Sequence, residues 1–111
     1  MGTFEITKRL NGEFQFNLKA GNGEIILASE GYTTLAACRN GIESVRKNAA
    51  DDARFDRKVA RDGSPFFTLK AVNGQIIGKS EMYRSTASRE KGIESVKRNA
   101  PEAVVIERLD I

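Results

Sequence analysis

The stretch that decides the fold is Leu18-Lys19-Ala20-Gly21-Asn22-Gly23-Glu24-Ile25-Ile26, which returns 51 residues later as Leu69-Lys70-Ala71-Val72-Asn73-Gly74-Gln75-Ile76-Ile77. Each copy is followed by the block Gly-Ile-Glu-Ser-Val, at 41–45 and again at 92–96. When residues 4–49 are aligned with 55–100 without gaps, 21 of the 46 positions are identical. A match of this extent indicates an internal duplication, so a motif in one repeat is compared with its counterpart 51 residues away.

The duplication predicts one domain with a shared core. The 111 residues suit a single domain, and a unit of 46 residues lies near the lower limit for folding without a disulfide or a metal. We therefore expect residues 1–111 to form one domain in which the two repeats, 4–49 and 55–100, pack against each other. Residues 101–111 follow the second repeat as a strand-like tail.

Alternating apolar residues before each Asn-Gly pair predict a β-hairpin. Asn22-Gly23 is a strong signal for a two-residue type I′ turn, in which both central residues adopt positive φ. Such a turn places Ala20 opposite Ile25 and Leu18 opposite Leu27. These residues are expected to share a buried face, and the second repeat follows the same plan. The predicted buried set is Phe14, Phe16, Leu18, Ala20, Ile25 and Leu27, with Phe67, Leu69, Ala71 and Ile76 in the second repeat.

A helix is predicted near the end of each repeat. Apolar residues recur at spacings of three and four over 35–49. The hydroxyl residues Thr34 and Ser85 precede the two helices and suit their N-caps. Asn48 and Asn99 stand where the helices should end, because asparagine tolerates the left-handed conformation that is common there.

Each predicted helix carries a glycine in its middle, Gly41 in the first repeat and Gly92 in the second. Glycine at such a position costs about 1 kcal/mol relative to alanine, so something should offset the loss in both repeats. We expect the sheet or the other helix to approach each glycine closely. A ligand pressed against the helix backbone is the functional alternative.

The tail has strand character, with Val104, Val105 and Ile106 in succession. Shifted back by 51 positions, Ile106 falls on Phe55, which itself falls on Phe4. We therefore expect these three residues to be equivalent core anchors, with the strand after each helix pairing with the sheet of the preceding repeat. A frayed terminus is the alternative.

Tandem copies of Phe-x-Phe-x-Leu-Lys-Ala-x-Asn-Gly-x-Ile-Ile, followed by Tyr and Gly-Ile-x-Ser-Val, resemble the YegP-like family of small bacterial proteins. The resemblance covers residues 4–100, and the second copy departs from it at Pro65, where the motif has its first Phe. It implies a duplicated β-β-β-α unit with pseudo-twofold symmetry, and no activity or functional residue, because the family is uncharacterised. With the residue patterns, it predicts an α+β fold with a mainly antiparallel sheet and two helices packed on it.

Composition and charge limit the setting of the protein. No apolar run approaches the ~20 residues that a membrane helix needs, and the N-terminus lacks the basic and apolar segments of a signal peptide. The single cysteine, Cys38, cannot form an internal disulfide, so we expect a cytoplasmic protein without membrane association. The net charge is +3, and the second repeat is the basic half, with 10 cations and 5 acids against 6 and 5 in the first.

Residues suited to catalysis are sparse. There is no histidine, so the commonest general base and metal ligand is absent. Cys38 lies on the apolar stripe of the first helix, where a buried, inert thiol is expected, and its counterpart in the second repeat is Arg89. No phosphate-binding or dinucleotide-binding spacing is present. We therefore expect a non-enzymatic binding or interaction domain with no catalytic residue, no metal site and no cofactor, and with an unknown partner.

One constellation supports a specific binding hypothesis. The second hairpin places an aromatic residue among lysines on the sheet face away from the core, an arrangement that can stack bases and meet phosphates. Cations also crowd the end of the second helix, where the helix dipole is sufficient to explain them. Nucleic-acid binding through the basic repeat is the alternative function, and coverage of this face by protein is the simpler interpretation. The candidate binding residues are Phe66, Lys70, Ile77, Lys79, Lys97 and Arg98.

Overall fold

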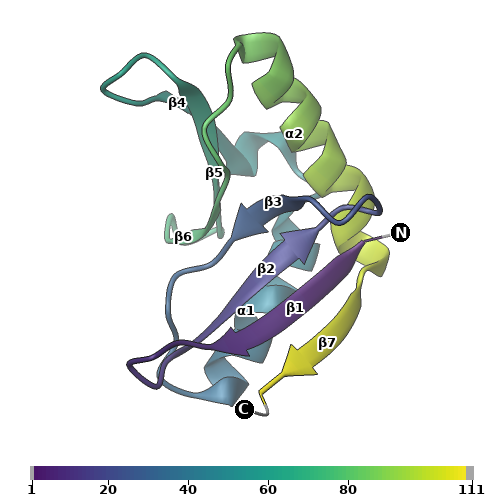
Figure 1. Cartoon of the computed structure of the whole chain (residues 1–111). Coiled ribbons are helices and arrows are strands. Elements are labelled where there is room, and N and C mark those ends of the chain that lie inside the picture. Colours follow the sequence, from purple (N-terminus) through teal and green to yellow (C-terminus); the bar gives the residue numbers. More distant parts are fainter. Residues whose placement is uncertain (1, 110–111) are drawn as a thin grey trace.

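The computed structural model describes residues 2–109, which form two β-β-β-α repeats followed by a last strand (Figure 1). The strands are β1 Thr3–Lys8, β2 Phe14–Lys19, β3 Ile25–Ala28, β4 Phe55–Val59, β5 Pro65–Lys70, β6 Ile76–Lys79 and β7 Val104–Arg108. The helices are α1 Leu35–Asn48 and α2 Thr86–Asn99, and short 3-10 turns follow them at η1 Asp52–Arg54 and η2 Ala100–Glu102.

All seven strands join one sheet in the order β4-β5-β6-β3-β2-β1-β7, with β4 and β7 at its opposite ends (Figure 1). Neighbouring strands are antiparallel except β1 and β7, which are parallel. The repeats meet where Ala28 of β3 pairs with Lys79 of β6. These residues are 51 positions apart and thus equivalent, so the pseudo-twofold axis passes between them. The predicted α+β fold with a duplicated unit is confirmed.

One hydrophobic core lies between the sheet and the two helices. Helix α1 packs on β2 of its own repeat and reaches β5 and β6 of the other, while α2 packs on β5 and reaches β3. Each repeat therefore buries apolar residues against the other, as its small size requires. The largest fully buried side chains are Phe4, Ile6, Phe16, Leu18, Leu27, Cys38, Ile42, Val45, Phe67, Leu69, Ile93 and Val96.

The turn of each hairpin differs from the prediction. Gly23 has a φ of 87°, but Asn22 does not adopt positive φ, so the turn is not type I′. The Gly23 N–H instead donates to the Ala20 carbonyl at 2.9 Å, which is typical of a type I turn followed by a glycine bulge. Gly74 repeats this geometry in the second hairpin, with a φ of 86°. The predicted two-residue loop is therefore wrong.

Beyond each turn, a β-bulge changes which isoleucine is buried. Lys19 pairs with Ile25, where the prediction placed Ala20 opposite Ile25. Two residues of β3 then oppose one of β2, and the extra residue, Ile26, joins the core. Ile25 is 44% exposed, so its predicted burial is wrong.

The second hairpin repeats the bulge, with its register shift between Leu69 and Lys70. Ile76, predicted to be buried, is 48% exposed. Ile77, predicted to lie on the face away from the core, is part of the core instead. The rest of the predicted core is confirmed: Phe16, Leu18, Leu27, Phe67 and Leu69 are buried, and Phe14, Ala20 and Ala71 pack against them partly buried.

The predicted helix starts are confirmed. The Thr34 hydroxyl accepts from the Ala37 N–H at 3.0 Å, and the Ser85 hydroxyl accepts from the Ser88 N–H at 3.1 Å. Each bond satisfies one of the amides that a helix leaves without an internal partner at its first turn. Within residues 2–109, neither helix is long and apolar enough to cross a membrane.

The helices do not end through left-handed asparagines as predicted. Ala49 follows Asn48 in a right-handed conformation and continues the hydrogen-bonding pattern. The buried Asn48 amide instead donates to the Ser44 carbonyl at 2.8 Å, and Asn99 does the same with Ser95. The asparagines therefore satisfy carbonyls of the preceding turn, and the chain leaves each helix through a 3-10 turn.

Close packing against the helix glycines is confirmed, but the nearest neighbour is the tyrosine before each helix, and the sheet residue Phe16 or Phe67 is only the next. A Cβ on Gly41 would collide with the hydroxyl of Tyr32, and a Cβ on Gly92 would collide with the hydroxyl of Tyr83. The Tyr32 ring stacks on Phe16, with centroids 6.2 Å apart, which holds the hydroxyl over the helix backbone. The tyrosine of each repeat thus occupies the space that an alanine side chain would need.

The tail forms an ordered strand, but it does not continue the repeat. β7 pairs in parallel with β1 of the first repeat, and not with the preceding repeat, while β4 pairs with β5 of its own repeat. Phe4 lies opposite Val105, whereas Ile106 lies opposite Glu5 and is 37% exposed. Phe4 and Phe55 are buried, but Ile106 is not an equivalent anchor, because the register places it on the side of the sheet away from the helices.

Candidate functional site on the outer face of the sheet

The sheet face away from the helices, here called the outer face, carries the polar side of the strands. In the second repeat, pairing places Asp56 opposite Thr68, Thr68 opposite Lys79, and Lys70 opposite Ile76. The first repeat contributes the equivalent side of β1, β2 and β3. The outer face consists of Thr3, Glu5, Thr7, Gln15, Asn17, Lys19, Ile25, Ala28, Asp56, Lys58, Phe66, Thr68, Lys70, Ile76, Lys79, Val104, Ile106 and Arg108.

Three of the predicted site residues lie together on this face. The Lys79 ammonium sits 5.1 Å from the centroid of the Phe66 ring, a cation–π contact. Thr68 lies between Phe66 and Lys70 on β5, and it is only 3% exposed. Its hydroxyl oxygen is buried without a hydrogen-bond partner in the part of the chain that the structure describes. The aromatic residue and its lysines are therefore assembled as predicted.

The lysines beside this aromatic residue are partly neutralised. Lys70 Nζ lies 3.1 Å from a carboxylate oxygen of Asp56, and Lys58 Nζ lies 3.4 Å from the same oxygen. The hydrogen bond from Lys70, with the nearby charge of Lys58, holds the pKa of the Asp56 carboxyl below its usual value. Lys79 is left as the cation of this cluster with no carboxylate partner among residues 2–109.

The remaining predicted residues lie elsewhere. Ile77 is buried in the core because the β-bulge turns it inward. Lys97 and Arg98 are on α2, which packs on the opposite side of the sheet. Lys97 Nζ lies 2.7 Å from an Asp52 carboxylate oxygen and 5.7 Å from the Phe55 ring centroid, so it is engaged within the fold. The candidate residues of the helix end and of the sheet therefore lie on different sides of the molecule.

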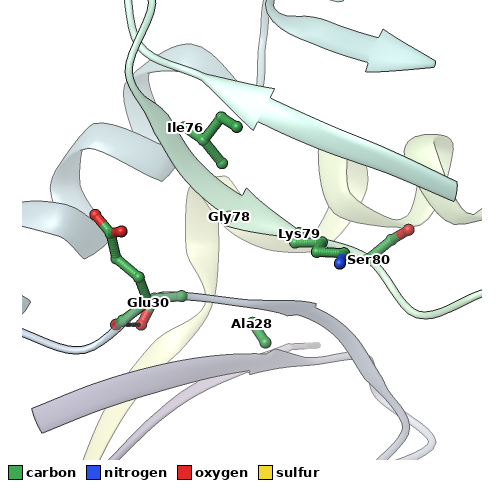
Figure 2. Close-up of a pocket in the computed structure, with 7 residues that line it drawn as sticks. Ala28, Glu30, Ile76, Gly78, Lys79 and Ser80 are labelled. Atoms are coloured by element: carbon green, nitrogen blue, oxygen red, sulfur yellow. Dashed lines mark hydrogen bonds between the residues drawn. The ribbon is translucent and has the colours of Figure 1, made fainter. Parts of the chain in front are cut away.

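A groove opens where the two repeats meet. β3 and β6 diverge on either side of the Ala28–Lys79 pair, and the space between them has a volume of about 310 Å³. Figure 2 shows Ile76 on one side of this seam groove, with Ala28 and Glu30 on the other. The exposed lining is mostly apolar, and Lys79 stands beside it. The seam groove is lined by Ala28, Ser29, Glu30, Ile76, Gly78, Lys79 and Ser80.

Sequence patterns alone missed the apolar part of this surface. Ile25 and Ile76 were both assigned to the core, and Ala28 was assigned to no site. Adjacent residues of a regular strand face opposite sides of the sheet, so only one member of an Ile-Ile pair can be buried. A bulge changes which of the two it is. The pairs Ile25-Ile26 and Ile76-Ile77 after a glycine turn were the signal that could have indicated the bulge.

The first repeat carries a matching but differently charged surface. Glu5 accepts from Arg108, and Lys19 Nζ lies 3.1 Å from its other carboxylate oxygen. These two cations hold the pKa of Glu5 below its usual value, the Arg108 hydrogen bond having the larger effect. Gln15 and Ala28 stand where the second repeat has Phe66 and Lys79. The aromatic and cationic cluster is thus confined to the second repeat.

Groups able to react are held in unreactive settings. Cys38 is fully buried, and burial raises the pKa of its thiol to about 11, which keeps the nucleophilic thiolate scarce. Burial likewise raises the pKa of the Tyr32 and Tyr83 hydroxyls above their usual value. Among residues 2–109, no group of three or more side chains of the metal-binding types lies close enough to hold a metal ion.

Comparison with known proteins decides the family. The model of a domain of unknown function, DUF1508, matches residues 10–56 and again residues 60–107, so the family domain occurs twice, as the duplication predicts. The chain belongs to the DUF1508 family. A DUF1508 relative from Stutzerimonas stutzeri, the UPF0339 protein in the ptx operon 5′ region, is 58% identical over 106 residues, covering 96% of each chain. The UPF0339 protein YegP of Escherichia coli O157:H7 is 50% identical over 104 residues, covering 94% of each chain.

Solved structures agree with this membership of the DUF1508 family. The NMR structure of a UPF0339 protein from Shewanella oneidensis superposes with a TM-score of 0.92 at 48% identity, covering 97% of this chain and 92% of that one. The NMR structure of yegP from E. coli gives a TM-score of 0.94 at 46% identity, covering 99% and 95%. The resemblance to the YegP-like family is confirmed. These relatives show no specific function, and nothing in them supports nucleic-acid binding.

Proposed function

We propose that this DUF1508 protein is a non-enzymatic interaction domain that binds an acidic partner protein on the outer face, with the seam groove at the centre of the contact. The observation that carries the proposal is the seam groove itself. It is a mostly apolar hollow between two diverging strands, flanked by the exposed Ile76 and by Lys79, whose ammonium has no carboxylate partner among residues 2–109. Protein interfaces typically have such an apolar centre with a polar rim.

The charge of the outer face favours an acidic partner. The face presents five cations against two carboxylates, and opposite charges on a partner would both steer association and reject basic competitors. The cations are Lys19, Lys58, Lys70, Lys79 and Arg108, and the carboxylates are Glu5 and Asp56.

The non-enzymatic part of the proposal rests on the side chains available. The sequence has no histidine, and Cys38 is buried with a raised pKa. The outer face offers lysines, hydroxyl groups and apolar residues, which suit recognition better than proton transfer. The proposal includes a cytoplasmic setting, which the single unpaired cysteine supports.

Site-specific photo-crosslinking in the cells that express the protein tests this function. With p-benzoylphenylalanine placed at position 76, we expect a discrete protein adduct that disappears when Lys79→Glu is added. The matched control places the same crosslinker at position 10, because Leu10 is fully exposed on the β1–β2 turn, outside the seam groove. Adducts at position 10 equal to those at position 76 would contradict the proposal. An adduct that a nuclease removes would instead support the nucleic-acid alternative.

A further inference from the structure

The two outermost strands of the sheet, β4 and β7, differ in how their free edges are protected. β4 begins the second repeat just as β1 begins the first, so the two strands are equivalent under the pseudo-twofold. β1 is covered by β7, whereas the corresponding edge of β4 has no strand beside it among residues 2–109. Uncovered strand edges invite pairing with other chains, so natural proteins protect them.

The β4 edge is protected by charge. Its sequence is Phe-Asp-Arg-Lys-Val, with three charged residues in succession at 56–58, and charged side chains discourage pairing at an edge strand. Arg89 on α2 also holds β4 in place, donating from Nη1 to the Lys58 carbonyl at 3.2 Å.

The β7 edge has no comparable protection. Val104, Val105 and Ile106 are 51%, 39% and 37% exposed, and no strand pairs with the far side of β7 in the described part of the chain. The strand is nevertheless held firmly on its inner side. Arg46 donates to the Ala103 carbonyl at 2.8 Å just before β7 begins, and to the Pro101 carbonyl at 3.1 Å. An apolar, pre-ordered and uncovered edge suits β-strand addition.

We propose that β7 pairs antiparallel with β7 of a second copy of this chain, around a twofold axis at Val105, to form one sheet across two subunits. In this register Val104 lies opposite the partner subunit's Ile106, and the two Val105 residues lie opposite each other. The β-branched residues therefore form cross-strand pairs, which are favourable in sheets.

A second copy fits this edge better than an unrelated peptide because the edge is complementary to itself. The twofold contact also closes, so it yields a dimer, whereas a contact between β7 and β4 would grow into an open-ended chain. The charged residues of β4 at 56–58 disfavour that second contact. The two outer faces of the dimer lie on the same side of the joined sheet, since antiparallel pairing keeps opposite residues on one face.

Sedimentation of the full chain from micromolar to millimolar concentration tests the proposal. We expect a dimer, and we expect Val105→Lys to weaken its association by about tenfold or more, because two like charges then meet on the axis. Val72→Lys is the matched control, since Val72 is 70% exposed on the β5–β6 turn and should leave the dimer unchanged.

Mixed samples of labelled and unlabelled chain identify the contact itself. Intermolecular nuclear Overhauser effects should connect Val104 with the partner subunit's Ile106. A wild-type chain that stays monomeric throughout the concentration range would overturn the proposal, whether or not the variants fold. A dimer that Val105→Lys leaves intact, or whose intermolecular contacts lie outside β7, would overturn it as well. Peptide-dependent pairing by a monomeric chain would indicate a foreign strand as the occupant.

Discussion

Ala28 and Lys79 pair with each other across β3 and β6, and each occupies the other's position in the repeat. This single pair marks the axis that relates the two halves of the chain and joins their strands into one sheet. The same pair lines the seam groove, where an alanine from one repeat faces a lysine from the other. The duplication therefore creates a surface that neither repeat has alone.

Neither half should fold as an independent monomer. Each helix contacts strands of the other repeat, so separating the halves would expose apolar surface on both. Separate polypeptides of residues 1–50 and 51–111 are expected to be unfolded or to self-associate. Proton–nitrogen correlation spectra of each half provide the measurement, and two well-dispersed monomeric spectra would refute the shared core.

Replacing Gly92 should destabilise the protein although glycine is unfavourable in helices. Alanine would gain about 1 kcal/mol in helix propensity, but its Cβ collides with the Tyr83 hydroxyl. We expect Gly92→Ala to lower the free energy of unfolding by about 1–3 kcal/mol, and Gly92→Leu by more. Lys91→Ala, at the exposed neighbouring position, should change it by less than about 0.5 kcal/mol. A higher melting temperature for Gly92→Leu would show that space is not the constraint.

Stability should fall in acid partly through Glu5. Arg108 and Lys19 lower the pKa of Glu5 in the folded state below the unfolded value near 4.5. Its contribution is therefore present above that unfolded value and is lost as the pH falls through the lower folded pKa. Urea unfolding between about pH 5 and pH 3 should show a smaller loss for Glu5→Gln than for wild type. Glu81→Gln, which removes an exposed carboxylate, is the control, and equal losses for both variants would contradict the linkage.

Removing β7 should lower the free energy of unfolding, but by less than the loss of three fully buried apolar residues would. The three apolar residues of β7 are about half exposed, so each contributes roughly half of the 1.5–3 kcal/mol that full burial supplies. A chain ending after Ala103 should therefore lose about 3 kcal/mol of unfolding free energy. Chemical denaturation measures the loss. An unchanged midpoint would show that β7 does not stabilise β1.

The duplication and most of the core could be read from the sequence because they rest on strong periodic signals. The alternation of Phe16 and Leu18 and the capping hydroxyl of Thr34 placed strands and helix correctly. The exposed Ile25 and Ile76 were misplaced because the extra residue at each bulge exchanges the faces of the two isoleucines next to the turn, while Leu27 beyond the bulge keeps its predicted face.

The candidate site was predicted only in part, for the same reason. The bulge leaves Phe66, Lys70 and Lys79 on the predicted face of the sheet, so these three residues were grouped correctly. The seam groove depends on how β3 and β6 meet, which is a long-range pairing with no local sequence signal. The parallel entry of β7 beside β1 is long-range as well, which explains why Ile106 was misplaced.

The most direct test of the proposed binding function is chemical-shift mapping of the isotopically labelled protein with the partner captured at position 76. We predict that amide shifts change in 25–30, 66–70 and 76–80, around the seam groove, and that Lys79→Glu abolishes these changes. Shift changes confined to α1 and α2, or binding that is unaffected by Lys79→Glu, would contradict the assignment of the outer face as the interaction surface.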